Sequence, residues 1–144
     1  MTVAMIDGEF NVCSRNLNLK ESEGNTLWGL ARKYNIEENM RKLHLDNYAI
    51  QGECVGPGVE GNHYELKNAD FYVYTIYDII AGKYVSPIIR ATFCKGLGLK
   101  HVPGLGVMTL AELTIDEVLK MADGKSSKAT RRYCLQADRW SRAL

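Results

Sequence analysis

The feature that most constrains this chain is one acidic residue between an apolar run and a glycine-rich turn, followed by an aromatic strand. Glu53 closely follows the apolar run of residues 48–51. The turn after it holds Pro57, whose ring fixes its φ angle. Alternation along residues 70–78 predicts a strand with two side-chain faces, Phe71, Val73 and Thr75 on one and Tyr72, Tyr74 and Ile76 on the other. A carboxylate beside an aromatic face suits a ligand made of a sugar and a base, because the carboxylate accepts hydroxyl hydrogens and a ring stacks on the base.

Composition sets wider limits. With 144 residues and 46% hydrophobic side chains, the chain is long enough for one domain with its own core. The net charge of +1 excludes a broad basic field, so a nucleic-acid contact would have to be a local patch. The four cysteines form no C-x-x-C pair and the three histidines are scattered, so we expect reduced thiols and no metal site. No run approaches the ~18 apolar residues of a membrane span, and a cytoplasmic protein is the default expectation.

The remaining local signals predict an α+β fold, an antiparallel-sheet core with short helices outside it. Asp7-Gly8 predicts a hairpin turn between strands at residues 2–6 and 9–14. Other signals predict a helix capped by Thr26 and helices that begin near Asn35, at Ser86-Pro87 and at the capping box Thr114 to Glu117. Gly98 and Gly124 are the expected stops of the last two helices, and Ile115, Val118, Leu119 and Ala122 are expected to face inward in the last. Residues 101–108 are expected to be extended.

The strings Gln-Gly-Glu-x-x-Gly-Pro-Gly-x-x-Gly-Asn at residues 51–62 and Asp-Phe-Tyr-Val-Tyr-x-Ile-Tyr-Asp at residues 70–78 carry a resemblance. Together they resemble the middle of the nucleotidyltransferase domain of ATP-dependent RNA ligases. The upstream residues 12–16, Val-Cys-Ser-Arg-Asn, are similar to the segment that follows the nucleophile motif in that family. The resemblance covers residues 1–128 and implies a partial nucleotidyltransferase domain.

The resemblance implies three ATP-binding residues. Glu53 stands where the family binds the ribose, and Tyr74 replaces the phenylalanine whose ring stacks on adenine. Arg15 matches the arginine that faces the nucleotide phosphate and the RNA end, and its forked guanidinium suits phosphate oxygens. Thr75 departs from the usual aspartate. The alternatives are a solvated carboxylate, a half-buried strand aromatic and an exposed surface arginine.

The resemblance also shows what the chain lacks. The complete family enzymes use ATP and Mg²⁺ and attack the α-phosphate with the lysine of a K-x-D-G motif. Here Met5, and no lysine, stands two places before Asp7, and the later metal-binding and K-x-K motifs are absent too. We therefore expect an RNA ligase fragment that holds nucleotide and RNA ends but does not ligate alone, completed by another polypeptide or self-associating. The rival interpretations are a non-catalytic nucleotide- or RNA-end-binding module and a structural remnant.

The last segment, residues 129–144, differs from the rest. It is basic, shows no clear period and contains Trp140 without apolar neighbours in sequence. Permitted codons for residues 130–140, read one nucleotide later, encode a string of the form E-G-x-x-x-K. We therefore hypothesise that this tail is a frameshifted translation of a longer ligase gene, which the nucleotide sequence of the gene tests.

Overall fold

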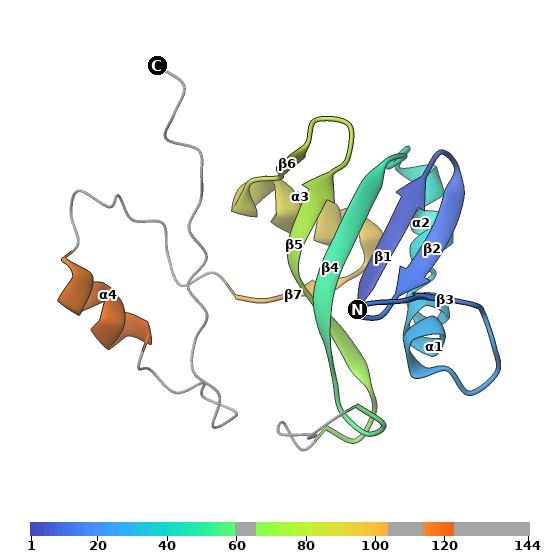
Figure 1. Ribbon diagram of the computed structural model, residues 1–144, viewed down its shortest axis with the longest axis horizontal. Helices are drawn as coiled ribbons and strands as arrows, with labels where there is room; N and C mark the ends of the chain where they lie inside the picture. The colour runs from blue at the N-terminus through green and yellow to red at the C-terminus, as the bar shows by residue number, and fades with distance from the viewer. Residues whose placement is uncertain (60–65, 104–113, 123–144) are drawn as a thin grey trace. The chain divides into compact units, whose positions relative to one another are not determined.

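The computed structural model describes residues 1–59, 66–103 and 114–122 (Figure 1). The chain divides into two compact units, residues 1–103 and 104–144. Of the elements in the described residues, the first unit contains the seven strands and three of the four helices.

The first unit is built on one sheet with the strand order β3-β2-β1-β4-β5-β6. The strands are β1 Thr2–Ile6, β2 Glu9–Cys13, β3 Asn18–Leu19, β4 Tyr48–Val55, β5 Asp70–Asp78, β6 Lys83–Tyr84 and β7 Lys100–His101. All neighbours along this order are antiparallel, but β7 pairs in parallel with the first half of β5. The predicted α+β class is confirmed, whereas the sheet is mixed and not purely antiparallel.

The helices α1 Thr26–Lys33, α2 Ile36–Lys42 and α3 Pro87–Leu97 lie on one face of this sheet (Figure 1). The core forms between them and the strands, and its fully buried side chains include Val3, Met5, Val12, Ile36, Met40, Ile50, Phe71, Val73, Ile76 and Leu97. Burial of such side chains is worth roughly 1.5–3 kcal/mol each, so this layer supplies most of the driving force for folding. The opposite face of the sheet carries no described helix of this unit.

A β-bulge interrupts the pairing of β4 with β5. Gln51 pairs with Thr75 and Gly52 pairs with Val73, so Tyr74 is the extra residue on β5. An extra residue shifts the alternation of every side chain beyond it. The sequence prediction that Ile76 lies on the face of Tyr72 was therefore wrong, because Ile76 joins Val73 in the core.

Local signals explain most of the turns and helix ends. Asp7 and Gly8 have φ of 49° and 80°, as the predicted hairpin turn requires. The predicted stop and start of α3 are also confirmed, with Ser86 accepting the Ile89 amide and Gly98 left-handed at φ 67°. The prediction of Thr26 as a cap was wrong, since the preceding residue caps α1.

Asn25 is that cap. Its side-chain oxygen accepts the backbone amides of Leu27 and Trp28, at 3.0 and 3.2 Å. The second helix begins where the sequence predicts, but its flanking Asn35 is left-handed at φ 48° and makes no capping bond with its side chain. The two asparagines thus start their helices by different means.

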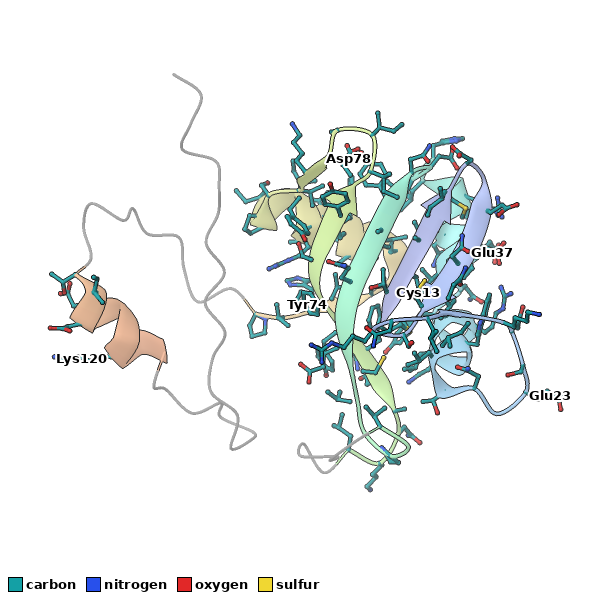
Figure 2. The ribbon with its side chains drawn as sticks, in the orientation of Figure 1. Cys13, Glu23, Glu37, Tyr74, Asp78 and Lys120 are labelled. Carbon is teal, nitrogen blue, oxygen red and sulfur yellow. The ribbon has the colours of Figure 1, made fainter. Side chains whose placement is uncertain are left out.

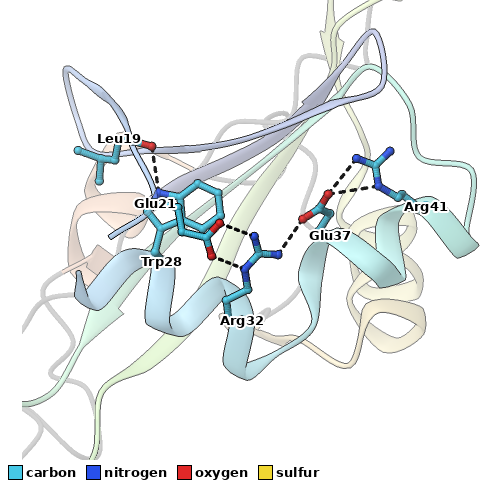
Figure 3. Close-up of polar contacts among 6 residues, drawn as sticks. All are labelled: Leu19, Glu21, Trp28, Arg32, Glu37 and Arg41. Atoms are coloured by element: carbon cyan, nitrogen blue, oxygen red, sulfur yellow. Dashed lines mark hydrogen bonds and ion pairs between the residues drawn. The ribbon is translucent and has the colours of Figure 1, made fainter. Parts of the chain in front are cut away.

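A chain of ion pairs ties α1 to its neighbours (Figure 3). The Arg32 guanidinium binds Glu21 through two nitrogens, at 2.8 and 2.7 Å, and reaches Glu37 on α2 at 2.7 Å. Glu37 also pairs with Arg41 at 2.9 Å. Beside these, the Trp28 indole nitrogen donates to the Leu19 carbonyl at 2.9 Å. The network fixes the loop between β3 and α1 against the helices.

The second unit contributes the helix α4, Ile115–Ala122. Its predicted capping box is confirmed, because Glu117 accepts the Thr114 amide at 2.8 Å while Thr114 accepts the Glu117 amide at 3.4 Å. The prediction that Ile115 faces inward was wrong, as the side chain is 80% exposed. The predicted stop at Gly124 and the tail 129–144 lie outside the described residues. None of the described helices has the length and apolar composition to cross a membrane.

Candidate nucleotide-binding site

The Gln-Gly-Glu segment lies in the middle of the sheet, held by its neighbours on both sides. Gly52 exchanges two backbone hydrogen bonds with Met1, at 2.9 and 3.0 Å, beside the start of β1. A Cβ added at Gly52 would lie 2.4 Å from the Phe71 ring and 2.5 Å from the Tyr72 carbonyl oxygen. Only glycine allows β5 to approach this closely. Gly52 therefore faces the core, and Glu53 points to the opposite, helix-free face, where it is exposed.

Tyr74 lies two residues along β5 from Tyr72, the residue that pairs with Glu53. It is the bulge residue of β5, it is 41% exposed, and Figure 2 labels it next to that strand. Partial burial raises the pKa of the Tyr74 phenol, and the negative charge of Glu53 raises it further. The structure therefore places two of the three predicted site residues, Glu53 and Tyr74, close enough for the charge of Glu53 to act on the Tyr74 phenol.

Arg15 lies in the exposed turn that follows β2. The Ser14 amide donates to the Leu17 carbonyl at 2.9 Å, which closes the turn around Arg15. Cys13, Thr2 and Gln51 lie in one row across β2, β1 and β4, and β2 and β4 run in the same direction. Arg15 and Glu53 each follow this row by two residues, so both lie toward the same end of the sheet.

Arg90 contacts the bulge and was missed by the sequence analysis. It lies on α3, is only 9% exposed, and its Nη1 donates to the Tyr74 backbone carbonyl at 2.5 Å. The only signal in the sequence was an arginine one helical turn before Cys94, whose spacing places both on the buried face. Nothing local indicates that a strand carbonyl needs a donor there.

A second polar cluster at the start of β5 was also missed. Asp70 is 8% exposed, accepts Lys100 Nζ at 2.5 Å and binds the Tyr34 hydroxyl and the Phe71 amide. Burial alone would raise the pKa of Asp70, but these hydrogen bonds together hold it below its usual value. Lys100 Nζ also lies 5.6 Å from the centre of the Tyr72 ring. This cluster joins β5, β7 and the end of α1, which indicates a structural role.

Three other candidates remain among the described residues: a nucleophilic thiol at Cys13, a metal site and a dinucleotide-binding glycine loop. None of them is supported. Burial raises the pKa of the Cys13 thiol, which does not favour an activated nucleophile. Within residues 1–59, 66–103 and 114–122, no group of three or more His, Cys, Asp or Glu side chains could hold a metal ion. The glycine turn after β4 has positive φ at Gly56 and Gly58 and opens no helix over its described residues, which does not favour a dinucleotide-binding loop. Its continuation at residues 60–65 lies outside the described part.

The mixed sheet with helices on one face matches part of the nucleotidyltransferase fold of RNA ligases. The family model described as RNA ligase matches residues 1–138. The chain therefore belongs to the RNA ligase family. The match ends inside the segment 129–144, and the frameshift hypothesis stays a prediction.

Solved structures agree with the family assignment. A Naegleria gruberi RNA ligase with PPi is 38% identical to the chain, with a TM-score of 0.80. A variant of that ligase with ATP and Mn gives the same identity and TM-score, and an apo variant gives a TM-score of 0.81. Each match covers 91% of this chain but only 40% of the Naegleria chain. No curated protein sequence matches the chain.

Proposed function

We propose that residues 1–103 form the nucleoside-holding part of an ATP-dependent RNA ligase domain. Glu53 accepts the ribose hydroxyls, the Tyr74 ring stacks on adenine, and Arg15 faces the phosphate and the RNA end. The observation that carries this proposal is that Glu53 and Tyr74 are both exposed at the helix-free face of the sheet, where the negative charge of Glu53 raises the pKa of Tyr74. A carboxylate and a ring a few residues apart on paired strands match the two ends of a nucleoside.

ATP is the ligand we favour, because a related ligase was solved with ATP and Mn. The exposed acceptor and ring fit the nucleoside. For Mg²⁺ the fit is poor, since the described residues provide no cluster of metal ligands. We therefore assign the chain binding and orientation of the nucleotide only.

The nucleophile is the second element of the proposal. Asp7 and Gly8 form the turn between β1 and β2, with Met5 two residues before Asp7, so this Asp-Gly pair does not belong to a nucleophile motif. Covalent catalysis on ATP needs a neutral lysine amine at the α-phosphate. We propose that ligation requires such a lysine from outside residues 1–144, and that these residues supply the binding of nucleotide and RNA ends.

Thermal unfolding with and without ATP tests the binding role. At ATP concentrations of about ten times Kd, binding contributes roughly 1.4 kcal/mol, which raises Tm by several degrees in a domain of this size. Glu53→Ala and Tyr74→Ala are expected to remove this rise while leaving the Tm of the free protein near that of the wild type. Glu9→Ala, an exposed strand carboxylate on β2, is the matched control and should keep the rise. No stabilisation of the wild type by ATP, AMP or an RNA 5′-phosphate end would leave only the structural remnant.

A separate assay addresses catalysis. Incubation with radiolabelled ATP and Mg²⁺, followed by a denaturing gel, should show no covalent label on the chain alone. A labelled band that resists denaturation would contradict the proposal that the nucleophile comes from elsewhere.

A further inference from the structure

The edge of β5 that faces away from β4 is covered in three different ways. The Val73 carbonyl accepts the Val102 amide after β7, and the Ile76 carbonyl accepts the Val85 amide after β6, both at 2.9 Å. Tyr74 lies between them in sequence, and its carbonyl accepts Arg90 Nη1 at 2.5 Å. At the bulge, the backbone carbonyl of β5 is therefore satisfied by a side chain from α3. On either side of the bulge, the carbonyls are satisfied by backbone amides that follow the short strands β7 and β6.

Burial of the Arg90 side chain costs free energy that a purely structural role does not explain. The side chain is more than nine-tenths buried, and its Nε is a buried nitrogen for which the described residues supply no hydrogen-bond partner. No carboxylate ion pair accompanies it among the described contacts of the first unit. A buried charge without a full set of partners stabilises a fold less than an apolar side chain of similar volume. Stability alone therefore does not account for an arginine here.

The helix that carries Arg90 is well placed to act as a support. Ser86 caps its first turn, Pro87 begins it, and the Arg90 amide donates to the Ser86 carbonyl at 2.8 Å. Farther along, Cys94 and Leu97 are buried in the core. The backbone of Arg90 is consequently fixed, so that its guanidinium reaches the Tyr74 carbonyl from a rigid element.

We propose that Arg90 is a positioning residue that holds the β5 bulge in the one conformation that presents the Tyr74 ring beside Glu53. A bulge re-aims the side chain of its extra residue, and the conformation of that residue depends on where its carbonyl is hydrogen-bonded. Without the Arg90 donor, the Tyr74 carbonyl turns toward another partner and the ring leaves the place where a base would stack.

Nuclear magnetic resonance of the free chain tests the conformational part of this proposal without any ligand. In Arg90→Met, which keeps an unbranched stem and loses the donors, the Tyr74 ring and the Tyr74 and Thr75 amides should shift and broaden. Lys95→Met, at an exposed position of the same helix, is the control and should leave them unchanged. Unchanged Tyr74 and Thr75 resonances in Arg90→Met would overturn the proposal.

A double-mutant cycle with AMP as the probe tests the consequence for binding, and this arm rests on the proposed function. Arg90→Met should weaken AMP binding about tenfold, which is the effect of displacing one stacked base. In the Tyr74→Ala background the same substitution should weaken it less than twofold, because the ring that Arg90 positions is already absent. An equal loss in both backgrounds would show that Arg90 acts only through general stability, and would overturn the proposal.

Two further results are distinguishable. If the wild-type chain binds no AMP, the proposed function fails, while the resonance comparison still decides whether Arg90 positions Tyr74. If Arg90→Met does not fold, Arg90→Lys takes its place, because lysine keeps the charge and an ammonium donor group but is shorter and lacks the fork of the guanidinium. It should show the same Tyr74 shifts at smaller size, and resonances identical to the wild type would count against the proposal.

Discussion

Adding one methyl group at Gly52 should destabilise the sheet at its centre. The new Cβ of Gly52→Ala would lie 2.4 and 2.7 Å from two atoms of the Phe71 ring, and 2.5 Å from the Tyr72 carbonyl oxygen. Phe71 is fully buried and the carbonyl belongs to the backbone of β5, so neither can move away without disturbing its neighbours.

The magnitude follows from the kind of contact. Overpacking of a tight core typically costs about 1–3 kcal/mol, and here the clash includes a backbone atom, so we expect at least about 2 kcal/mol. For a unit of about a hundred residues, that loss lowers Tm by roughly 8–16 °C. Because Glu53 follows directly on β4, the forced separation of the strands should also weaken any ATP stabilisation.

Differential scanning calorimetry of Gly52→Ala measures this effect, and Gly29→Ala is the matched control. Gly29 lies inside α1, its φ is not in the left-handed region, and nothing lies within 4 Å of an added Cβ. Alanine is favoured over glycine in a helix by roughly 1 kcal/mol, so the identical substitution should raise Tm there. A Tm for Gly52→Ala equal to or above that of the wild type would refute the steric reasoning.

Two further predictions concern charge and capping. The pKa of Glu37, which two arginines hydrogen-bond, and that of Asp70 are both below their usual values, so their stabilisation is present above pH ~4 and is lost as the pH falls through the folded-state pKa. Tm measured against pH should therefore drop in acid, and Asp70→Asn, which weakens the contact with Lys100, should reduce the drop; a drop of unchanged size would contradict the assignment. Asn25→Ala should lose about 1 kcal/mol in urea unfolding because it removes a cap, whereas Asn35→Gly should change stability little or increase it, as Asn35 makes no cap bond and has a positive φ. Equal losses at the two positions would argue against the capping difference.

The predictions from sequence that succeeded concern neighbouring residues. Asp7-Gly8 specifies its hairpin because two adjacent residues must adopt positive φ, and Ser86-Pro87 starts a helix because the cap and the first turn are adjacent in sequence. The strings around Glu53 and Tyr74 pointed to the RNA ligase family for a similar reason, as each is a short contiguous motif.

The predictions that failed depend on partners far away in the chain. Strand alternation placed Ile76 beside Tyr72, but the bulge exists only because β4 and β5 pair with one residue in excess. Sequence could not predict the parallel strand β7, since two residues show no period, nor the role of Arg90, since the carbonyl that it satisfies lies sixteen residues away on another element.

The amino-acid sequence by itself therefore determined the kinds of elements, most of their ends and the family, because these depend on φ preferences, caps and motifs within a few residues. Only the tertiary structure decided which way the side chains at the site point. That choice is made by strand register and by one buried guanidinium, and both are settled when distant segments compete for the same backbone hydrogen bonds.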